Sequence, residues 1–560
     1  MDLEPGTELS RREFLRTASA GGIALAVGNT ACASRADWPA GGGVVQEQET
    51  HRWLVPTFEL DELTVDDLQG GMASGRWSAV EITEMYLDRI AGIDDQGPEL
   101  RSVLETNPDA RQIAQSLDAE RATGRVRGPL HGVPILIKDN IGTADRMTTT
   151  AGSRALEGSI PPHDATIVRK LREAGAVILG KANLSEWANF RSQRSSSGWS
   201  GRGGQCANPY ALHRSPCGSS SGSAVGVSAN LAAVAIGTET NGSIVCPASS
   251  CGVVGVKPTV GLWSRSVIIP ISHSQDTAGP ITRTVRDAAI LLGPLTGADA
   301  RDPATTAGMA NSRVDYTRFL ETDGLRGARI GVARANFGFD DRVDRVMEEA
   351  LLAMKDAGAT VVDEVVIPNQ SGLAGPAYEV LLYEFKSNLN AYLEGLGAEA
   401  PIRSLEDAIR FNQENRDSEM RYFGQDVFLA AQEKGPLTEQ PYRDALERVQ
   451  RLSGAEGIDA AMNRYGVDAL VAPTSGPAWV IDLIDGDHFG GSSSSPAARA
   501  GYPNITVPAG FVMGLPVGLS FFGRRWSEGT LLRMAYAFEQ ATMVRRAPGF
   551  KTRDDLSAAP

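Results

Sequence analysis

The sequence predicts an α/β protein built as one large domain. Short apolar runs typical of buried strands alternate with segments of helical periodicity along the chain, and such alternation favours a sheet flanked by helices on both faces. Neither an internal repeat nor a linker interrupts residues 55–550. The chain has 560 residues, of which 42% are hydrophobic, so it can bury a large core without disulfides or a structural metal.

Apolar patterning predicts the elements of the first part of the chain. Apolar residues recur at helical spacing over 80–93 and 110–123. The run Val133-Pro-Ile-Leu-Ile-Lys138 is apolar without alternation, as in a strand buried on both faces. A helix over 164–174 and a strand over 176–179 follow.

The same alternation continues toward the C-terminus, with one interruption. Small residues over 224–231 predict a helix, and the apolar run over 232–237 predicts the strand after it. Residues 370–465 favour a long, charged helical insertion. The remaining predicted elements are strands over 328–333, 360–367, 469–472, 505–507 and 517–522, and helices over 343–356 and 528–542.

The first 33 residues are typical of an export signal. The pair Arg11-Arg12 precedes Phe14-Leu15 and a short apolar run, and Ala31-Cys32-Ala33 fits a cleavage site. These features indicate a twin-arginine signal peptide over 1–33, so we expect a periplasmic or secreted protein.

The rest of the chain divides into three parts. Residues 34–55 are small and glycine-rich, which predicts a flexible lead-in. The catalytic domain is expected over 56–550, with 370–500 as a variable region on the substrate side, and 551–560 as a tail. After the signal, apolar runs are too short to cross a membrane, so no membrane contact is expected of the mature form.

Charge and cysteine usage exclude several classes of function. The 54 basic and 68 acidic residues give a net charge of −14, which argues against a nucleic-acid partner because such a surface needs excess basic residues. The five cysteines form no C-x-x-C pair and have no adjacent histidine, so zinc is not expected. No other metal and no cofactor is predicted. The oligomeric state is left open.

Two familiar site patterns are also disfavoured. Residues 175–181 have the spacing of a phosphate-binding loop, but Ala182 stands where a hydroxyl is needed for magnesium. The six histidines, including His131, lie in no recognisable catalytic setting, and no G-x-S-x-G turn occurs. We expect each histidine in a turn or at the surface.

The strongest chemical signal is a pair of serine-containing loops. The first, Cys217-Gly-Ser-Ser-Ser-Gly-Ser-Ala224, leads directly into a predicted helix, so its backbone amides could bind an anionic oxygen. The second, Gly237-Thr-Glu-Thr-Asn-Gly-Ser-Ile244, follows a strand, where active-site loops of α/β sheets lie. Together with Lys138 at the end of a buried strand, the loops supply two hydroxyls and a base.

These residues resemble the amidase signature family of serine hydrolases, and the resemblance runs from about residue 60 to the end. Lys138 lies in a strand similar to the one that carries the family's catalytic lysine. Ser219 matches the serine that the family holds in a cis peptide bond, and Ser243, 24 residues later, matches its nucleophile. The stretches 500–510 and 514–518 are also similar. The fold implied is a single domain with a mixed central sheet.

The resemblance implies a mechanism without histidine. A serine hydroxyl needs a base to become a good nucleophile, and burial disfavours the charged form of a lysine. Neutral Lys138 would accept a proton from Ser219, which would accept one from Ser243. Ser243 would then attack an amide carbonyl and form an acyl-enzyme.

The loop Thr240-Asn241-Gly242-Ser243 would hold the oxyanion through its backbone amides. Ser220 would support the network by hydrogen bonding, and it is also predicted, with this loop, as an oxyanion or substrate-binding residue. Two positions differ from many family members. Asn241 stands where a glycine is common, and so does Ser221 in the first loop. Both changes keep the backbone amides and affect substrate fit more than chemistry.

Several neighbours of the site are expected to be structural. Asp139, Asn140 and Asp276 are predicted to cap or brace loops rather than to take part in chemistry. Cys217 and Cys246 lie near the two serines and could approach each other, but we expect buried thiols. The sequence itself decides no pairing among the four cysteines after residue 33.

Within the family the closest likeness is to peptide amidases, which remove the C-terminal amide of peptides. The similar stretches are 181–187, 198–204, 208–210, 237–240 and 274–277. The expected substrate is therefore a peptide amide or a similar small amide. The glutaminase component of an amidotransferase and a general or aryl-acyl amidase remain alternatives. A non-catalytic binding protein is disfavoured because all three catalytic positions are present.

Overall fold

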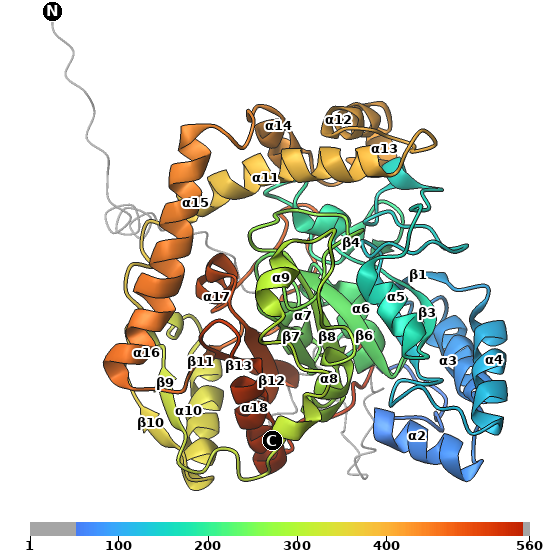
Figure 1. The fold of residues 1–560 in the computed structure, drawn as a ribbon, viewed down its shortest axis with the longest axis horizontal. Coiled ribbons are helices and arrows are strands. Elements are labelled where there is room, and N and C mark those ends of the chain that lie inside the picture. The colour runs from blue at the N-terminus through green and yellow to red at the C-terminus, as the bar shows by residue number, and fades with distance from the viewer. Residues whose placement is uncertain (1–51, 553–560) are drawn as a thin grey trace, which may run out of the picture. The chain divides into compact units, whose positions relative to one another are not determined.

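A mixed sheet of eleven strands forms the centre of the computed structural model, which describes residues 52–552 (Figure 1). The predicted signal peptide, residues 34–51 of the lead-in and residues 553–560 of the tail lie outside the described residues. The strands of the sheet are β1 Val103–Thr106, β2 Pro134–Lys138, β3 Val177–Ala182, β6 Val234–Glu239, β7 Val254–Lys257, β8 Thr277–Thr282, β9 Arg329–Val332, β10 Thr360–Val362, β11 Ala469–Pro473, β12 Asn504–Val512 and β13 Leu515–Phe522. A separate hairpin pairs β4 Trp199–Ser200 with β5 Gly204–Gln205.

The strand order places the predicted catalytic strand inside the sheet. The order is β1-β3-β2-β6-β8-β7-β12-β13-β11-β9-β10. Strand β2 is parallel to both β3 and β6, whereas β6, β8, β7, β12, β13 and β11 pair antiparallel in succession. Because β2 and β6 are parallel, their carboxyl ends reach the same edge, so Lys138 and the loop after Glu239 lie together.

Helices cover both faces of the sheet, as predicted. The α-helices are α2 Val65–Ser74, α3 Ala79–Ile93, α4 Ala110–Ala122, α5 Thr166–Glu173, α6 Ser221–Ser228, α7 Val245–Ser250, α8 Val285–Leu292, α9 Ala304–Gly308, α10 Asp341–Asp356, α11 Ala374–Gly395, α12 Leu405–Glu414, α13 Arg416–Glu419, α14 Asp426–Gln432, α15 Gln440–Ser453, α16 Ala460–Tyr465, α17 Ser495–Ala500 and α18 Glu528–Thr542. Short 3₁₀ turns are η1 Arg154–Leu156, η2 Glu186–Asn189, η3 Thr317–Phe319 and η4 Arg334–Asn336, and η5 Gly454–Asp459 is a π-helical turn. Helices α6 and α7 pack together on the sheet, and α8, α10 and α18 form a second packed group.

Local sequence explains why several of these elements form. All five residues of β2 are buried, which fits its uninterrupted apolar run. Helix α3 begins with a capping box in which Ser78 and Glu81 each accept a backbone N–H from the other end of the turn. Helix α6 begins at Ser221, three residues before the predicted start, with Ser220 at its N-cap position. The serine loop is correspondingly shorter.

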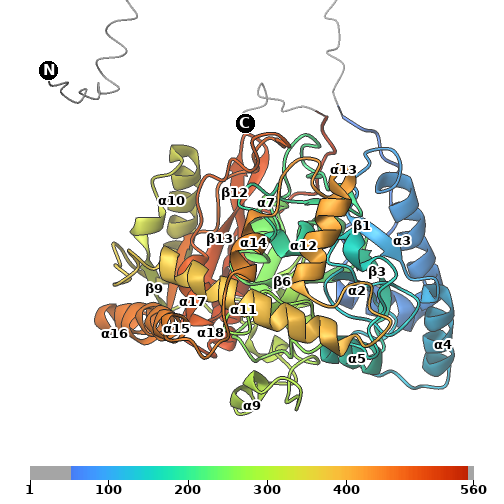
Figure 2. The same cartoon turned by 90° about the horizontal axis from the view of Figure 1, so that it is seen from above.

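The predicted insertion forms its own helical layer. Helices α11 to α14 lie across one end of the sheet, and α15 and α16 continue from them along its side (Figures 1 and 2). A second hydrophobic cluster, which includes Phe385 and Phe428, joins this layer to the turn at Trp187. The insertion therefore packs directly on segments that neighbour the predicted site.

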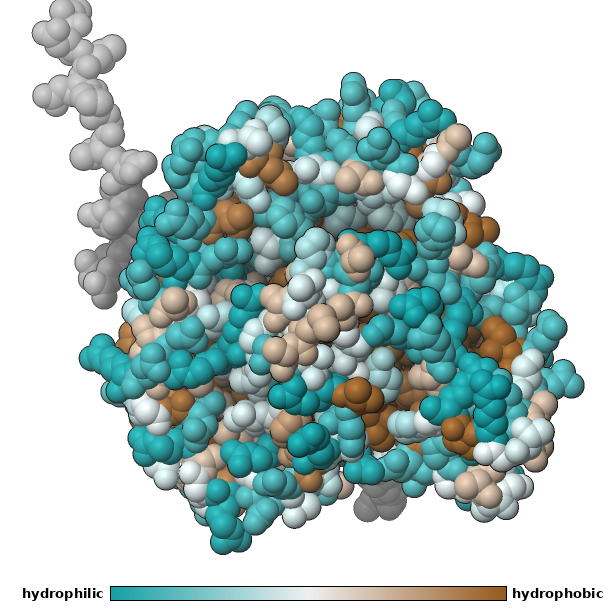
Figure 3. All heavy atoms as spheres, in the orientation of Figure 1, coloured by the Kyte–Doolittle hydropathy of each residue, from teal (hydrophilic) through white to brown (hydrophobic). Residues whose placement is uncertain are grey.

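Two other observations complete the fold. His131, which was expected in a turn or at the surface, lies in a turn, where it is buried and its Nε2 lies 2.9 Å from the carbonyl oxygen of Leu117. The face in Figure 3 is mostly hydrophilic, with apolar side chains in small separate groups. Within residues 52–552, no helix combines the length and apolarity needed to cross a membrane.

Candidate active site

Lys138 is the last residue of β2 and its side chain is fully buried. Its Nζ lies 2.7 Å from Ser219 Oγ, 2.9 Å from Thr238 Oγ1 and 3.2 Å from the Thr238 carbonyl oxygen. Burial lowers the pKa of Lys138 to about 7, although the carboxylates of Asp276 and Glu239 act in the opposite direction. A large share of Lys138 is therefore neutral near pH 7 and able to accept a proton.

Ser219 lies in the loop before α6, and the peptide bond between Gly218 and Ser219 is cis. The loop is held by backbone and side-chain bonds. The carbonyl oxygen of Ser219 accepts a hydrogen bond from the Ser185 amide at 3.0 Å, and Ser221 Oγ donates to the Cys217 carbonyl at 2.6 Å. Many family members have glycine at the position of Ser221, and here the serine side chain adds a hydrogen bond across the loop.

Ser243 lies in the loop that follows β6, and it is only partly buried. Its carbonyl oxygen accepts a hydrogen bond from the Ser220 amide at 3.1 Å, which joins the two serine loops. Within the described residues, no hydrogen bond links the hydroxyls of Ser243 and Ser219. Such catalytic contacts are often long in ligand-free structures and tighten when substrate binds.

The loop around Gly242 presents free backbone amides. Within residues 52–552, no acceptor is hydrogen-bonded to the N–H groups of Asn241, Gly242 or Ser243. Gly242 has φ of 82°, which favours glycine, and an added Cβ would lie 3.1 Å from Ser494 Oγ. The Asn241 side chain accepts from Ser494 Oγ at 2.7 Å and donates to Ser495 Oγ at 3.1 Å. These bonds fix the loop with its free amides at the site.

The supporting residues make bracing contacts. Ser220 Oγ donates to the Thr238 carbonyl and accepts from the Thr238 amide, and Ser220 does not line the cavity described below. Its position fits a brace better than the substrate contact that was also predicted. Thr240 donates to Asp276 at 2.6 Å, and Asn140 donates to Thr238 Oγ1 at 3.0 Å.

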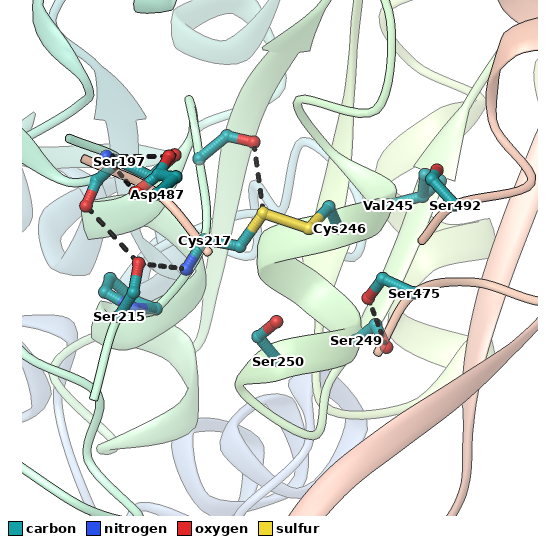
Figure 4. Close-up of a disulfide and its surroundings, with 12 residues drawn as sticks. Ser197, Ser215, Cys217, Val245, Cys246, Ser249, Ser250, Ser475, Asp487 and Ser492 are labelled. Atoms are coloured by element: carbon teal, nitrogen blue, oxygen red, sulfur yellow. Dashed lines mark hydrogen bonds between the residues drawn. A yellow bond between two sulfur atoms is a disulfide. The ribbon is translucent and has the colours of Figure 1, made fainter. Parts of the chain in front are cut away.

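A disulfide joins the first serine loop to helix α7, which begins just after the second loop, and this corrects the prediction of free thiols at these positions. Cys217 and Cys246 are bonded with their Cα atoms 6.0 Å apart, although they lie 29 positions apart in sequence (Figure 4). The pairing arises because β6 returns the chain to the first loop before α7 begins. It fixes the segment that precedes Ser219 to the helix that follows Ser243. Cys206 and Cys251 remain buried free thiols.

Ser243 opens into a cavity of about 420 Å³ that the two loops share with distant segments. The disulfide packs against Trp479, and this group forms part of the wall. Other lining residues include Asn189, Leu381 of α11 and Phe489. A second cavity of about 610 Å³ adjoins the first, since Ala188, Thr240 and Ile271 line both. Substrate access to Ser243 is thus from the side formed partly by residues 370–500.

Sequence patterns did not identify several of these features. Thr238, the second partner of Lys138, lies in the second serine loop, but no feature of the sequence marks it as a contact of the lysine. Asn189 and Trp479 reach the cavity only through tertiary folding, and nothing in their local sequence marks them. Among residues 52–552, no group of three or more His, Cys, Asp or Glu residues is placed to hold a metal ion.

Comparison with known proteins decides the family. A family model described as Amidase matches residues 81–532. The chain belongs to the amidase family. This amidase is 43% identical to a probable amidase of Arabidopsis thaliana over 506 residues, which covers 89% of this chain and 93% of that protein. The predicted family and its α/β fold are thereby confirmed.

Two further relatives carry the names of two of the predicted activities. The crystal structure of a peptide amidase from Stenotrophomonas maltophilia matches with a TM-score of 0.84 and 53% identity, and it covers 89% of this amidase and 100% of that chain. A glutamyl-tRNA(Gln) amidotransferase component of Thermoanaerobacter pseudethanolicus is 35% identical over 88% of this amidase and 99% of that protein.

Proposed function

We propose that this amidase hydrolyses the C-terminal carboxamide of peptides, or a similar small amide, through an acyl-enzyme on Ser243. The observation that carries the proposal is the buried 2.7 Å contact between Lys138 Nζ and Ser219 Oγ, beside the cavity that Ser243 lines. The 53% identity to a peptide amidase over nearly the whole chain supports the substrate class.

The proposed reaction moves one proton along the three catalytic residues. Neutral Lys138 accepts the proton of Ser219 as Ser219 accepts that of Ser243, and Ser243 Oγ bonds to the amide carbon. When the tetrahedral intermediate collapses, the C–N bond breaks and the proton returns through Ser219 to the departing ammonia or amine. Water then attacks the ester by the same route and releases the acid.

The free amides of Asn241, Gly242 and Ser243 supply the oxyanion site. Donors that are already oriented need no reorganisation when negative charge develops on the carbonyl oxygen. Removal of one such donor typically costs about 3 kcal/mol of transition-state stabilisation. Because these donors are backbone groups, side-chain substitution at Asn241 tests the loop position rather than the amides themselves.

The amidotransferase component is the weaker alternative. The Thermoanaerobacter protein shares 35% identity with this chain. A solved amidotransferase structure from Thermotoga maritima has a TM-score of 0.63 against 0.84 for the peptide amidase. A general or aryl-acyl amidase differs from the proposal only in the acyl group or leaving group accepted. Substrate trials separate all three.

We also propose twin-arginine export, with residues 1–33 as the signal. The proposal rests on the arginine pair, the short apolar run and the A-x-A pattern. The Cys217–Cys246 disulfide supports it, because such bonds persist in oxidising compartments outside the cytosol. Replacement of Arg11 and Arg12 by lysine should leave the protein uncleaved in the cytoplasm, and unchanged export would refute the proposal.

A substrate panel tests the activity. Peptide amides, glutamine, a fatty amide and an acyl anilide are incubated with the enzyme, and release of ammonia or amine is measured. We expect the highest kcat/KM on peptide amides. The Ser243→Ala variant should release neither ammonia nor amine from any of these substrates. Preference for glutamine would favour the amidotransferase alternative, and preference for the anilide would favour an aryl-acyl amidase.

A further inference from the structure

The turn η2 lies at the wall of the substrate cavity in an unusual backbone conformation. Trp187, Ala188 and Asn189 have φ of 50°, 54° and 72° in succession, and few non-glycine residues adopt such values. Conformations of this kind persist only where the surroundings determine them strongly, and they are common in ligand-binding sites. The turn is therefore a candidate for a substrate contact.

Buried contacts hold the turn from behind. The Trp187 amide donates to the Ala151 carbonyl at 2.9 Å, and the Trp187 ring packs edge-on against Phe428 with centroids 5.6 Å apart. Glu186 forms a fully buried ion pair with Arg191 at 2.9 Å. These contacts fix the backbone of the turn, and they therefore fix the position from which the Asn189 side chain extends.

Two backbone hydrogen bonds connect the turn to the catalytic loop. The Ser185 amide donates to the carbonyl of Ser219 at 3.0 Å, and the Asn189 amide donates to the carbonyl of Ser185 at 3.3 Å. Asn189 is thus tied to Ser219 through a single intervening residue. It also lines the cavity into which Ser243 opens.

Asn189 differs from the other polar residues of this cavity. Asp487 accepts from Ser197 and Trp479, Ser494 donates to Asn241, and Thr240 donates to Asp276. Among the lining residues, all of which the structure describes, only Asn189 and Ser243 have polar side chains without a hydrogen bond. Asn189 Oδ1 is buried and unpartnered, and buried polar groups normally have a partner.

We propose that the Asn189 carboxamide binds the peptide unit that precedes the scissile amide, and that it sets the preference for peptide amides. The Asn189 Nδ2 group has no hydrogen-bond partner within the described residues and, unlike Oδ1, keeps accessible surface, so it can donate to the C=O of that peptide unit. Apart from Ser243, the other polar side chains of the wall already have hydrogen-bond partners within the protein, so recognition of the substrate backbone falls to Asn189. This inference rests on the proposed function and names its specificity residue.

Two substrates that share a ring and a carboxamide test the proposal. N-acetyl-L-phenylalaninamide has the preceding peptide unit, and 3-phenylpropanamide lacks it. In Asn189→Ala we expect kcat/KM on the first to fall roughly 10- to 100-fold, and on the second to change less than about threefold. Asn189→Asp keeps the shape and tolerates positive φ but removes the N–H donor, so we expect a loss on the first substrate at least as large as that of Asn189→Ala.

The control is Asn369→Ala, which replaces another asparagine of positive φ, 63°, outside both cavities. It should leave both substrates unchanged, and thermal melts verify that all variants fold. Equal losses on both substrates in the Asn189 variants, no loss on either, or a wild type without preference would overturn the assignment of Asn189. A wild type that hydrolyses neither substrate would instead overturn the proposed function.

Discussion

Two buried lysines lie on neighbouring strands, and the two sites they form differ in chemistry. Lys138 ends β2 and Lys181 lies in β3, which is parallel to β2 and places Lys181 opposite Ile137. Both side chains are fully buried. Burial lowers the pKa of Lys138 to about 7 and that of Lys181 to about 8. Burial and strand position therefore do not distinguish them.

The partners of the two lysines account for the difference. Lys181 donates to the Ile141 carbonyl at 2.7 Å and to Thr149 Oγ1 at 2.8 Å, so it braces the segment after β2. Lys138 instead meets Ser219, whose loop adjoins the nucleophile. Each lysine thus contacts a carbonyl and a threonine hydroxyl, and only Lys138 also contacts a serine whose loop is bonded to that of Ser243, the proposed nucleophile. In this account a depressed lysine pKa serves catalysis only where the hydroxyl within reach can relay a proton from a nucleophile in the cavity.

The largest expected effect comes from Lys138 itself. Lys138→Ala should lower kcat on a peptide amide by at least about 10³-fold, because Ser219 then has no base for its own proton and cannot accept that of Ser243. Ammonia release measures the activity, and a cooperative thermal melt verifies folding. Turnover close to wild type in a folded Lys138→Ala enzyme would contradict the role of Lys138.

Of the two lysine sites, only that of Lys138 should depend on the disulfide for its geometry. It links the loop of Ser219 to the helix that follows Ser243, and a bond that closes a loop of this length contributes about 3.6 kcal/mol to the free energy of unfolding. The double variant Cys217→Ser/Cys246→Ser should lose that stability in urea titration and also lose activity. Cys206→Ser, at a free thiol, is the control. Full activity in the double variant would show that the loops need no covalent link.

Lys181 should affect stability rather than turnover. Lys181→Met leaves the Ile141 carbonyl and Thr149 without their donor, which should cost about 1–3 kcal/mol of unfolding free energy. At pH 8 we expect kcat/KM to stay within about threefold of wild type. A loss as large as that of Lys138→Ala would mean that the two buried lysines do not differ in role.

The smallest expected effect is a shift in pH dependence. Activity requires neutral Lys138, so kcat/KM should fall as pH drops below about 7. The Asp276 carboxylate raises the pKa of Lys138, so Asp276→Asn should move this fall to lower pH, by less than about one unit. A shift to higher pH, read from the rate profile, would contradict the electrostatic assignment.

Much of the lysine site could be predicted from sequence because its signals are local. The apolar run ending at Lys138 and the two serine loops each mark themselves within about ten residues. The disulfide and the place of Asn189 depend on contacts between segments far apart in the chain, so local patterns missed them. Lys181 illustrates the same limit, because only its tertiary partners separate it from Lys138.

The most direct test of the account is the rate at which a fluorophosphonate labels Ser243 as a function of pH, with the labelled peptide identified by mass. The account predicts that the wild-type rate falls about tenfold per pH unit below about 7 and is level above it. Lys181→Met should keep this profile, and Lys138→Ala should react slowly at every pH. A wild-type rate independent of pH between about 5.5 and 8.5, or an unchanged rate in Lys138→Ala, would contradict the assignment of Lys138 as the base.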